Sequence, residues 1–160
     1  MMLRSPGALF VLSVLVALWL QFLPLSPALS TVRPLWLAMV LGYWSLYGPN
    51  VSVLGAAVLL GLACDTLYNA PLGQHVVGLA LLSYTLIRLR AQLGLYAVWQ
   101  VTLLLIPAWA LYGGLMFVFD GMAKHPTALW NRLLPVVATT LCWPLVTLLL
   151  HGLRDPRARR

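Results

Sequence analysis

Hydrophobic residues form long uninterrupted runs along this chain, without the alternation of a strand or the polar stripe of a surface helix. Short breaks that are polar or contain proline separate these runs, and a helix that crosses a membrane needs about 20 apolar residues. The pattern predicts six helices, at residues 7–23, 34–47, 51–68, 76–87, 96–119 and 133–150. We therefore expect an all-α integral membrane protein that folds as a compact six-transmembrane-helix bundle.

The lengths of the runs and their prolines refine this plan. The second, third and fourth runs are short, so these helices could tilt, re-enter the membrane or pack as a buried unit. Pro107 predicts a kink in the fifth helix, and Pro144 predicts an interruption of the sixth. The first run is longer than the apolar part of a signal peptide, about 7–15 residues, so we expect it to be retained as a helix. Residues 1–153 then form a single membrane domain, and residues 154–160 form a basic tail.

Composition supports a membrane protein and excludes other classes. Hydrophobic residues make up 62% of the chain and charged residues 8%, whereas soluble domains carry about 25% charged residues. Such a chain cannot cover a globular surface with polar side chains. This excludes an ordinary soluble enzyme, a disordered tail and a DNA-binding module, and the continuous apolar runs argue against an outer-membrane barrel.

The charges predict an orientation. Ten Lys and Arg residues stand against three Asp residues, for a net charge of +7, and the basic residues fall in loops and tails. With both termini in the cytoplasm, the outer segments carry Arg33, Lys124 and Arg132. The inner segments then carry Arg4, Arg88, Arg90, Arg154, Arg157, Arg159 and Arg160. This excess satisfies the positive-inside rule and predicts a basic cytoplasmic surface, with membrane lipid rather than nucleic acid as its neighbour.

Asp65 lies inside the third predicted helix. A carboxylate in an apolar helix costs about 2.5–3.5 kcal/mol on insertion scales, so it needs a partner, water or a proton. Ala57, Gly61 and Asp65 recur every four residues and share one helix face, where small residues let a second helix approach closely. Three interpretations stay open. Asp65 anchors a hydrogen-bond network at the turn into the fourth helix, contacts a partner protein, or acts in ion or substrate movement.

The segment Gly73-Gln74-His75 extends this motif. Gly73 follows Pro71 and can adopt a positive φ, which suits a turn. Gln74 and His75 supply polar groups near the start of the fourth helix, where lipid cannot satisfy the backbone. We therefore expect a structural or partner-binding motif made of Gly61, Asp65, Gly73, Gln74 and His75.

Signals of catalysis are missing from the sequence. No nucleophile has a base beside it, no glycine-rich phosphate loop occurs, and no spacing of His, Cys and Asp suggests a metal site. We therefore expect no enzyme activity, no catalytic residue, no cofactor and no metal.

The central block 61–75 resembles the rod-shape-determining MreD family. In that family a glycine and an aspartate four residues apart precede a small loop, a glycine and a polar residue, as Gly61, Asp65, Gly73 and Gln74 do here. The residues that follow, Ala80, Tyr84 and Arg88-Leu89-Arg90, and the dipeptide Arg33-Pro34 before the second helix, are also similar. The resemblance covers essentially the whole chain, but only the central block is specific.

This resemblance implies a function and a set of partners. It implies a non-enzymatic inner-membrane scaffold of the bacterial cell-elongation complex, which pairs with the bitopic protein MreC and is linked to the actin-like MreB. That complex also contains the RodA glycosyltransferase and its penicillin-binding transpeptidase. The resemblance further implies a fold similar to the substrate-binding subunits of energy-coupling-factor transporters.

Two alternatives remain open. The chain could be a vitamin-type, small-molecule substrate-binding subunit of a transporter, with a polar pocket at Asp65 and His75. It could also contact a lipid-linked wall precursor, whose phosphates would meet Arg33, Lys124 and Arg132.

Overall fold

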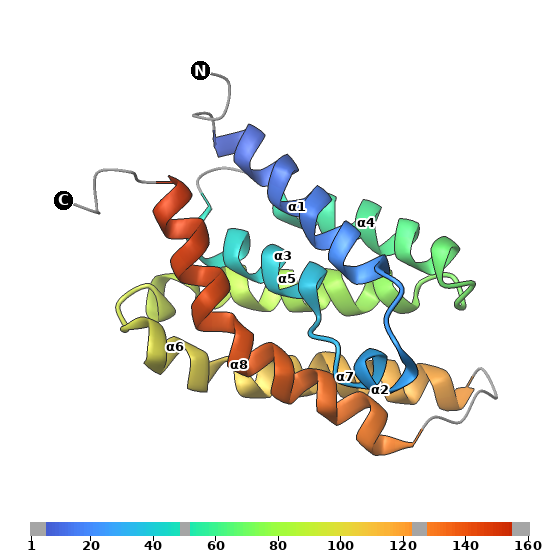
Figure 1. Ribbon diagram of the computed structural model, residues 1–160. Coiled ribbons are helices and arrows are strands. Elements are labelled where there is room, and N and C mark those ends of the chain that lie inside the picture. The colour runs from blue at the N-terminus through green and yellow to red at the C-terminus, as the bar shows by residue number, and fades with distance from the viewer. Residues whose placement is uncertain (1–5, 49–51, 123–127, 155–160) are drawn as a thin grey trace.

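The computed structural model describes residues 6–48, 52–122 and 128–154. Within these ranges the regular structure is entirely helical (Figure 1). The eight helices found there are α1 (Pro6–Phe22), α2 (Pro27–Thr31), α3 (Trp36–Tyr47), α4 (Val53–Leu67), α5 (Gln74–Leu93), α6 (Val98–Leu104), α7 (Ile106–Met122) and α8 (Leu129–Arg154).

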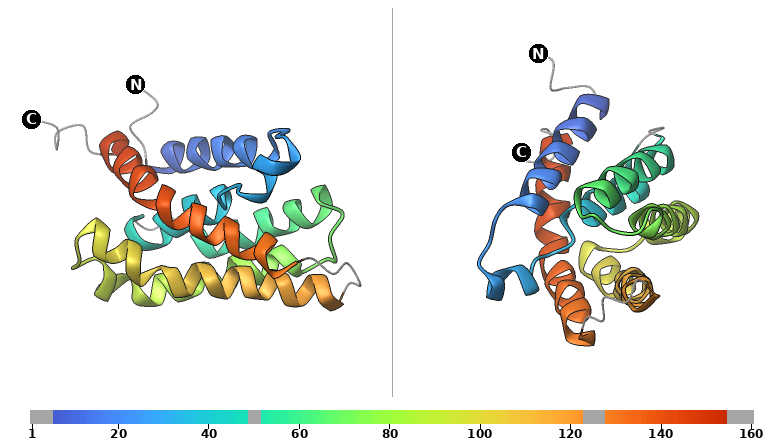
Figure 2. Two further views of the ribbon diagram at one scale, coloured as in Figure 1. Left: turned by 60° about the horizontal axis from the view of Figure 1, so that its bottom comes forward. Right: turned by 90° about the vertical axis from the view of Figure 1, so that its right-hand side faces the viewer.

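Six helical segments run back and forth between two ends of the molecule: α1, α3, α4, α5, α6 with α7, and α8 (Figures 1 and 2). The start of α1 and the end of α8 lie at the same end, together with the end of α5. We call this the basic end, after Arg88 and Arg90 near the end of α5 and Arg154 at the end of α8. The opposite end, which we call the turn end, contains the α4–α5 turn at residues 68–73 together with α2, the end of α7 and the start of α8.

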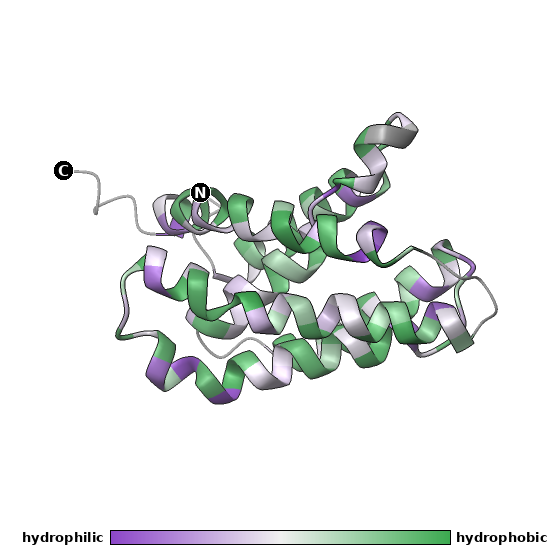
Figure 3. Ribbon diagram, turned by 90° about the horizontal axis from the view of Figure 1, so that it is seen from below, coloured by the Kyte–Doolittle hydropathy of each residue, from purple (hydrophilic) through white to green (hydrophobic). Residues whose placement is uncertain are grey.

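Within the described residues, three segments are long and apolar enough to cross a membrane: Gln74–Leu93, Val98–Met122 and Leu129–Arg154. The apolar helices α1 and α4 are shorter. Large hydrophobic side chains also point outward, among them Leu15, Trp19, Leu59, Leu141, Leu145 and Leu148. Hydrophobic residues cover most of the helix length, and hydrophilic residues gather mainly near the helix ends (Figure 3). An apolar exterior of this extent requires lipid or protein to cover it, so the chain is a membrane protein.

Helix α3 forms the centre of the bundle. Every residue from Leu37 to Leu46 is buried, and α3 contacts α1, α4, α5 and α8. Its 12 residues make a helix of about 18 Å, shorter than the roughly 30 Å hydrocarbon core of a bilayer. Because neighbouring helices surround it, α3 does not need to match that thickness. The second run was expected to tilt, to re-enter the membrane or to pack as a buried unit, and in the structure it packs as a buried helix.

Two helix boundaries differ from the sequence prediction. The fourth helix was expected to end at Ile87, but α5 continues to Leu93, so Arg88 and Arg90 lie inside it. Long arginine side chains can reach the membrane interface from a helix, so their charge does not end one. Similarly, the sixth helix was expected to end at Leu150, but α8 continues to Arg154.

The two prolines behave differently. The helix is interrupted close to Pro107, where a kink was expected, because α6 ends at Leu104 and α7 begins at Ile106. The expected interruption at Pro144 is wrong, since α8 continues through both Pro135 and Pro144. Membrane helices tolerate proline where neighbouring helices and hydroxyl side chains satisfy the freed backbone groups.

Candidate functional site

Asp65 lies in the last turn of α4 and is buried, with 1% of its surface exposed. Its Oδ2 accepts a hydrogen bond from the backbone N–H of Gly73 at 2.8 Å. Its Oδ1 accepts one from the backbone N–H of His75, also at 2.8 Å, and lies 2.9 Å from His75 Nδ1. The first N–H groups of a helix have no partner within it, so this carboxylate satisfies the start of α5 from the end of α4.

Gly73 is the N-cap of α5 and has a φ of 102°. The positive φ expected from the sequence is confirmed. A Cβ built at Gly73 would meet no heavy atom within 4 Å, so the backbone conformation and not crowding requires glycine there. This conformation aims the N–H groups of Gly73 and His75 at Asp65.

Gly61 lies one turn before Asp65, at a close approach between α4 and α5. A Cβ at Gly61 would lie 2.5 Å from Val76 Cα and 2.7 Å from Val76 N, so the backbone of α5 occupies the space of a side chain. Ala57, one further turn back, is fully buried. The small-residue face predicted from the sequence is therefore the contact between these helices.

Gln74 points away from Asp65 into a second buried cluster. Its Nε2 donates to Asp120 Oδ1 at 3.1 Å, and the Nε of Arg132 donates to Asp120 Oδ2 at 2.7 Å. Arg132 Nη2 forms an ion pair with the same oxygen. Asp120 is 8% exposed. The cluster ties α5, α7 and the start of α8 together at the turn end.

This second cluster was not predicted from the sequence. The fifth helix was expected to end at residue 119, just before Asp120, and Arg132 was interpreted as an outer basic residue that marks topology. The available signal was that both residues bound the most polar internal stretch of the chain, residues 120–132. Nothing in the sequence indicated Gln74, 46 positions before Asp120, as their partner.

Aromatic and polar contacts extend the site toward α1. The ring of Tyr68 stacks on that of His75, with centroids 5.3 Å apart. The hydroxyl of Tyr68 accepts a hydrogen bond from Gln21 Nε2 at 3.2 Å. Arg33 donates to the backbone carbonyls of Gln21 and Leu23, which come at the end of α1. These contacts join three chain segments around His75.

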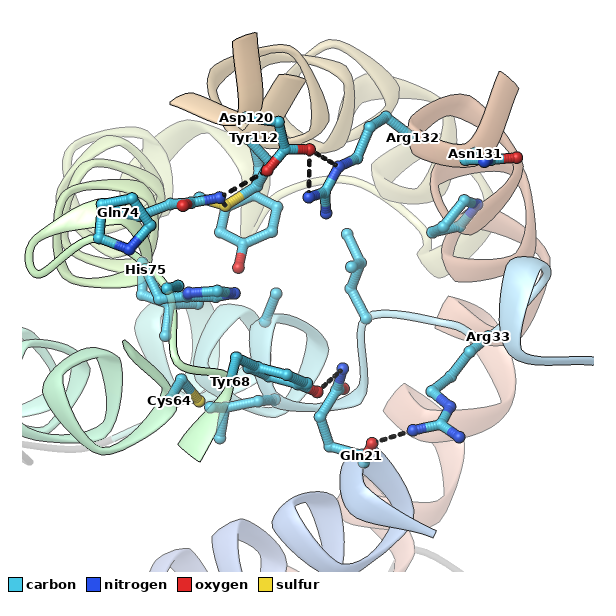
Figure 4. A pocket seen from close by; sticks show the side chains of 18 of the residues that line it. Gln21, Arg33, Cys64, Tyr68, Gln74, His75, Tyr112, Asp120, Asn131 and Arg132 are labelled. Carbon is cyan, nitrogen blue, oxygen red and sulfur yellow. Dashed lines mark hydrogen bonds and ion pairs between the residues drawn. The ribbon is translucent and has the colours of Figure 1, made fainter. Parts of the chain in front are cut away.

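A cavity of about 490 Å³ lies between these groups at the turn end (Figure 4). Polar side chains of Gln21, Arg33, Tyr68, Gln74, His75, Tyr112, Asp120 and Arg132 line it. Apolar lining comes from residues such as Leu37, Leu79 and Met116. Its volume is in the range of small-molecule sites, about 300–1,000 Å³. The part of the chain that the structure describes holds no group of three or more His, Cys, Asp or Glu side chains suited to a metal ion.

The expected basic surface is only partly within the described residues. Arg88 and Arg90 are exposed on α5, and the guanidinium of Arg88 lies over the ring of Tyr84, 5.4 Å from its centroid. Arg154 is exposed and donates to the backbone carbonyl of Tyr47, the last residue of α3. The remaining predicted basic residues, Arg4, Lys124, Arg157, Arg159 and Arg160, lie outside the described residues.

Comparison with known families decides the identity. The family model described as "rod shape-determining protein MreD" matches residues 4–153. The chain belongs to the MreD family. It is also 29% identical over 139 residues to a rod shape-determining protein MreD of Haemophilus influenzae, a match that covers 87% of this chain and 86% of that protein. No solved structure matches the chain.

Membership of the MreD family supports a role in determining rod shape. The match includes both polar clusters and all the described helices except the last residue of α8. MreD proteins are known as shape-determining proteins and not as enzymes.

Proposed function

We propose that this MreD-family protein is a non-enzymatic scaffold of the cell-elongation complex, which links MreC and the peptidoglycan synthases to the MreB cytoskeleton. The observation that carries the proposal is that each of the two buried carboxylates, Asp65 and Asp120, is fully engaged by hydrogen-bond donors. Both oxygens of Asp65 and both of Asp120 accept hydrogen bonds from donors on other chain segments. Carboxylates held in this way fix the relative positions of helices and are poorly placed to carry a moving ion.

The motif of Gly61, Asp65, Gly73, Gln74 and His75 then has a structural role. It holds α4 against α5 and, through Gln74, ties α5 to α7. We propose that this keeps the turn end in the shape that a partner protein recognises. Removing one of these contacts would therefore weaken partner binding without removing the protein from the membrane.

The proposed location is the bacterial inner membrane, with six crossings and both termini in the cytoplasm. In support, the start of α1 and the end of α8 lie at the same end as Arg88, Arg90 and Arg154, in keeping with the positive-inside rule. Residues 1–153 would form the single membrane domain and residues 154–160 its basic tail. A reporter fused after Arg160 should be active in the cytoplasm, and activity only outside it would contradict this topology.

The proposed partners follow from membership of the MreD family and from the different character of the basic end and the turn end of the bundle. MreC is the direct partner in the membrane, and RodA with its penicillin-binding transpeptidase belongs to the same assembly. MreB and anionic lipid would face the basic end. The proposal includes no catalytic residue, cofactor, metal or nucleic acid.

Purification from membranes tests the scaffold proposal. Tagged wild-type protein, solubilised in mild detergent, should retain MreC in near-stoichiometric amount. Asp65→Asn should retain less MreC at equal membrane abundance, whereas Thr66→Ala, a neighbouring change on the exposed side of α4, should retain as much as wild type. A folded wild-type protein that comes down without MreC would contradict the proposal.

The cavity at the turn end favours a second candidate, a small-molecule-binding subunit of a transporter. Its volume of about 490 Å³ and mixed polar and apolar lining suit a vitamin-sized ligand. This candidate predicts that native mass spectrometry of the purified protein finds a non-lipid small molecule bound. Protein that is consistently free of such a molecule would argue for the scaffold alone.

A further inference from the structure

The scaffold proposal leaves the cavity at the turn end without a role. The cavity is lined by the α4–α5 turn and by the starts of α3, α5 and α8, and it reaches deeper to Leu79, Tyr112 and Met116 (Figure 4). In the proposed topology these helix ends lie at the membrane surface. The cavity volume of about 490 Å³ exceeds the need of a few ordered water molecules. A cavity of this size and position can accept a ligand from the aqueous side or from the lipid headgroup layer.

The charge around the cavity favours an anion. Arg33 and Arg132 line it, whereas Asp120 is the single carboxylate among the lining residues in the described part of the chain. Asp120 already accepts from Gln74 and Arg132, and the two oxygens of Asp65 accept from the N–H groups of Gly73 and His75. The cavity wall therefore offers positive charge without a carboxylate oriented to bind a cation.

Hydrogen-bond donors also remain around the cavity. The Nε of Arg33 is buried and has no hydrogen-bond partner among the residues that the structure describes. Arg132 uses Nε and Nη2 on Asp120, and its guanidinium points toward the cavity, as does the hydroxyl of Tyr112 (Figure 4). Arg33 already donates through both Nη atoms to the carbonyls of Gln21 and Leu23, so single N–H groups of the two arginines remain. Each of these can form one charge-assisted hydrogen bond with an oxygen of a phosphate.

We propose that this cavity binds a phosphate-bearing group, held by Arg33 and Arg132 and by the hydroxyl of Tyr112. Leu37, Leu79 and Met116 supply an apolar wall for the uncharged part of the ligand. Two sources carry this chemistry: the headgroup of an anionic membrane lipid, and a soluble phosphate ester. The inference does not depend on the scaffold role, because a scaffold with or without a bound headgroup would hold the same partners.

Thermal unfolding of the purified protein in a neutral detergent tests the proposal. Three probes are titrated: dioctanoyl phosphatidylglycerol, glycerol 3-phosphate, and dioctanoylglycerol, which has the same acyl chains without phosphate. At least one phosphate probe should raise the Tm of the wild-type protein in a saturable manner, and dioctanoylglycerol should not. Phosphatidylglycerol alone would identify a lipid headgroup as the source, and glycerol 3-phosphate at similar concentration would identify a soluble ester.

Variants connect the effect to the cavity. Arg33→Gln should raise the half-maximal probe concentration about tenfold, as expected for the loss of one charge-assisted hydrogen bond. Tyr112→Phe removes a single hydroxyl and should raise it about fivefold, and this variant decides the test if Arg33→Gln does not fold. Arg88→Gln, an exposed change at the basic end, should leave it unchanged. The proposal is overturned if no phosphate probe stabilises the wild type, if dioctanoylglycerol stabilises it equally, or if Tyr112→Phe binds like wild type.

Discussion

Asp65 and His75 are joined at two points through one oxygen atom. Asp65 Oδ1 accepts the backbone N–H of His75 at 2.8 Å and lies 2.9 Å from the ring nitrogen Nδ1 of the same residue. A single carboxylate oxygen thus fixes both the first turn of α5 and the orientation of the imidazole. In this orientation the imidazole of His75 stacks on the ring of Tyr68. The position of the first turn of α5 also lets the side chain of Gln74 reach Asp120.

Asp65→Asn should destabilise the fold. The amide keeps one acceptor oxygen, but its NH₂ group would face N–H donors that the carboxylate now satisfies. Leaving a buried donor without a partner costs about 1–3 kcal/mol. The free energy of unfolding in detergent should fall by about that amount, measured by equilibrium unfolding that tryptophan fluorescence follows.

Two further variants control this measurement. Thr66→Ala removes a hydroxyl that bonds only to carbonyls of its own helix, so the change should stay within about 0.5 kcal/mol. Asp65→Glu keeps the charge but moves the carboxylate by one methylene, so it should also destabilise. A fully stable Asp65→Glu variant would show that a negative charge alone stabilises the fold at this position. The exact hydrogen-bond geometry of Asp65 with Gly73 and His75 would then be unimportant.

Gly61→Ala should push α4 and α5 apart. The added Cβ would lie 2.5 Å from Val76 Cα, and a backbone atom cannot move aside as a flexible side chain can. Overpacking of this kind costs about 1–3 kcal/mol, and a lowered Tm is the readout. Gly114→Ala is the matched control, since a Cβ there meets no heavy atom within 4 Å and alanine favours a helix. Equal loss of stability in both variants would refute the close approach.

Asp120 and Arg132 should show energetic coupling. The side chains are 10% and 31% exposed, so Arg132→Gln alone should cost about 1–3 kcal/mol, less than the loss of a partner from a fully buried pair. The double variant Asp120→Asn with Arg132→Gln should be more stable than the sum of the single changes predicts. A double-mutant cycle of unfolding free energies measures this, and strict additivity would mean that the pair contributes nothing.

The basic end makes a prediction about recruitment. Replacing Arg154, Arg157, Arg159 and Arg160 with Gln removes four positive charges. If this surface attracts an acidic cytoskeletal face or anionic lipid, MreB should co-localise less with the membrane at unchanged levels of the variant. Replacing Arg33, a cation at the turn end, should leave this recruitment unchanged. Normal MreB recruitment by the variant with all four substitutions would show that the basic end does not attract MreB.

Some of this site could be predicted from the sequence because its causes are local. A carboxylate within an apolar run needs donors, and a glycine after a proline provides a turn that can present them. Asp65, Gly73 and His75 lie within eleven consecutive positions, so chain connectivity already brings them close. The small face at Ala57 and Gly61 followed from helical spacing alone.

The remainder depends on packing that hydropathy does not encode. Helix α3 is apolar on all sides, and in a membrane both lipid and protein favour such a surface, so its sequence could not show that it is central. Gln74 meets Asp120 across 46 positions, and only the arrangement of α5 against α7 brings them together. Likewise, α5 continues past Arg88 because long side chains let charge leave the apolar region while the helix continues.

The most direct test of the central claim is the shape of living cells after depletion of this protein. If the chain is a scaffold of the elongation complex, depleted cells should become round, and wild-type protein or the Thr66→Ala variant should restore rods. Asp65→Asn, expressed to the same membrane level, should restore them only partly. Cells that stay rod-shaped after verified loss of the protein would contradict the account.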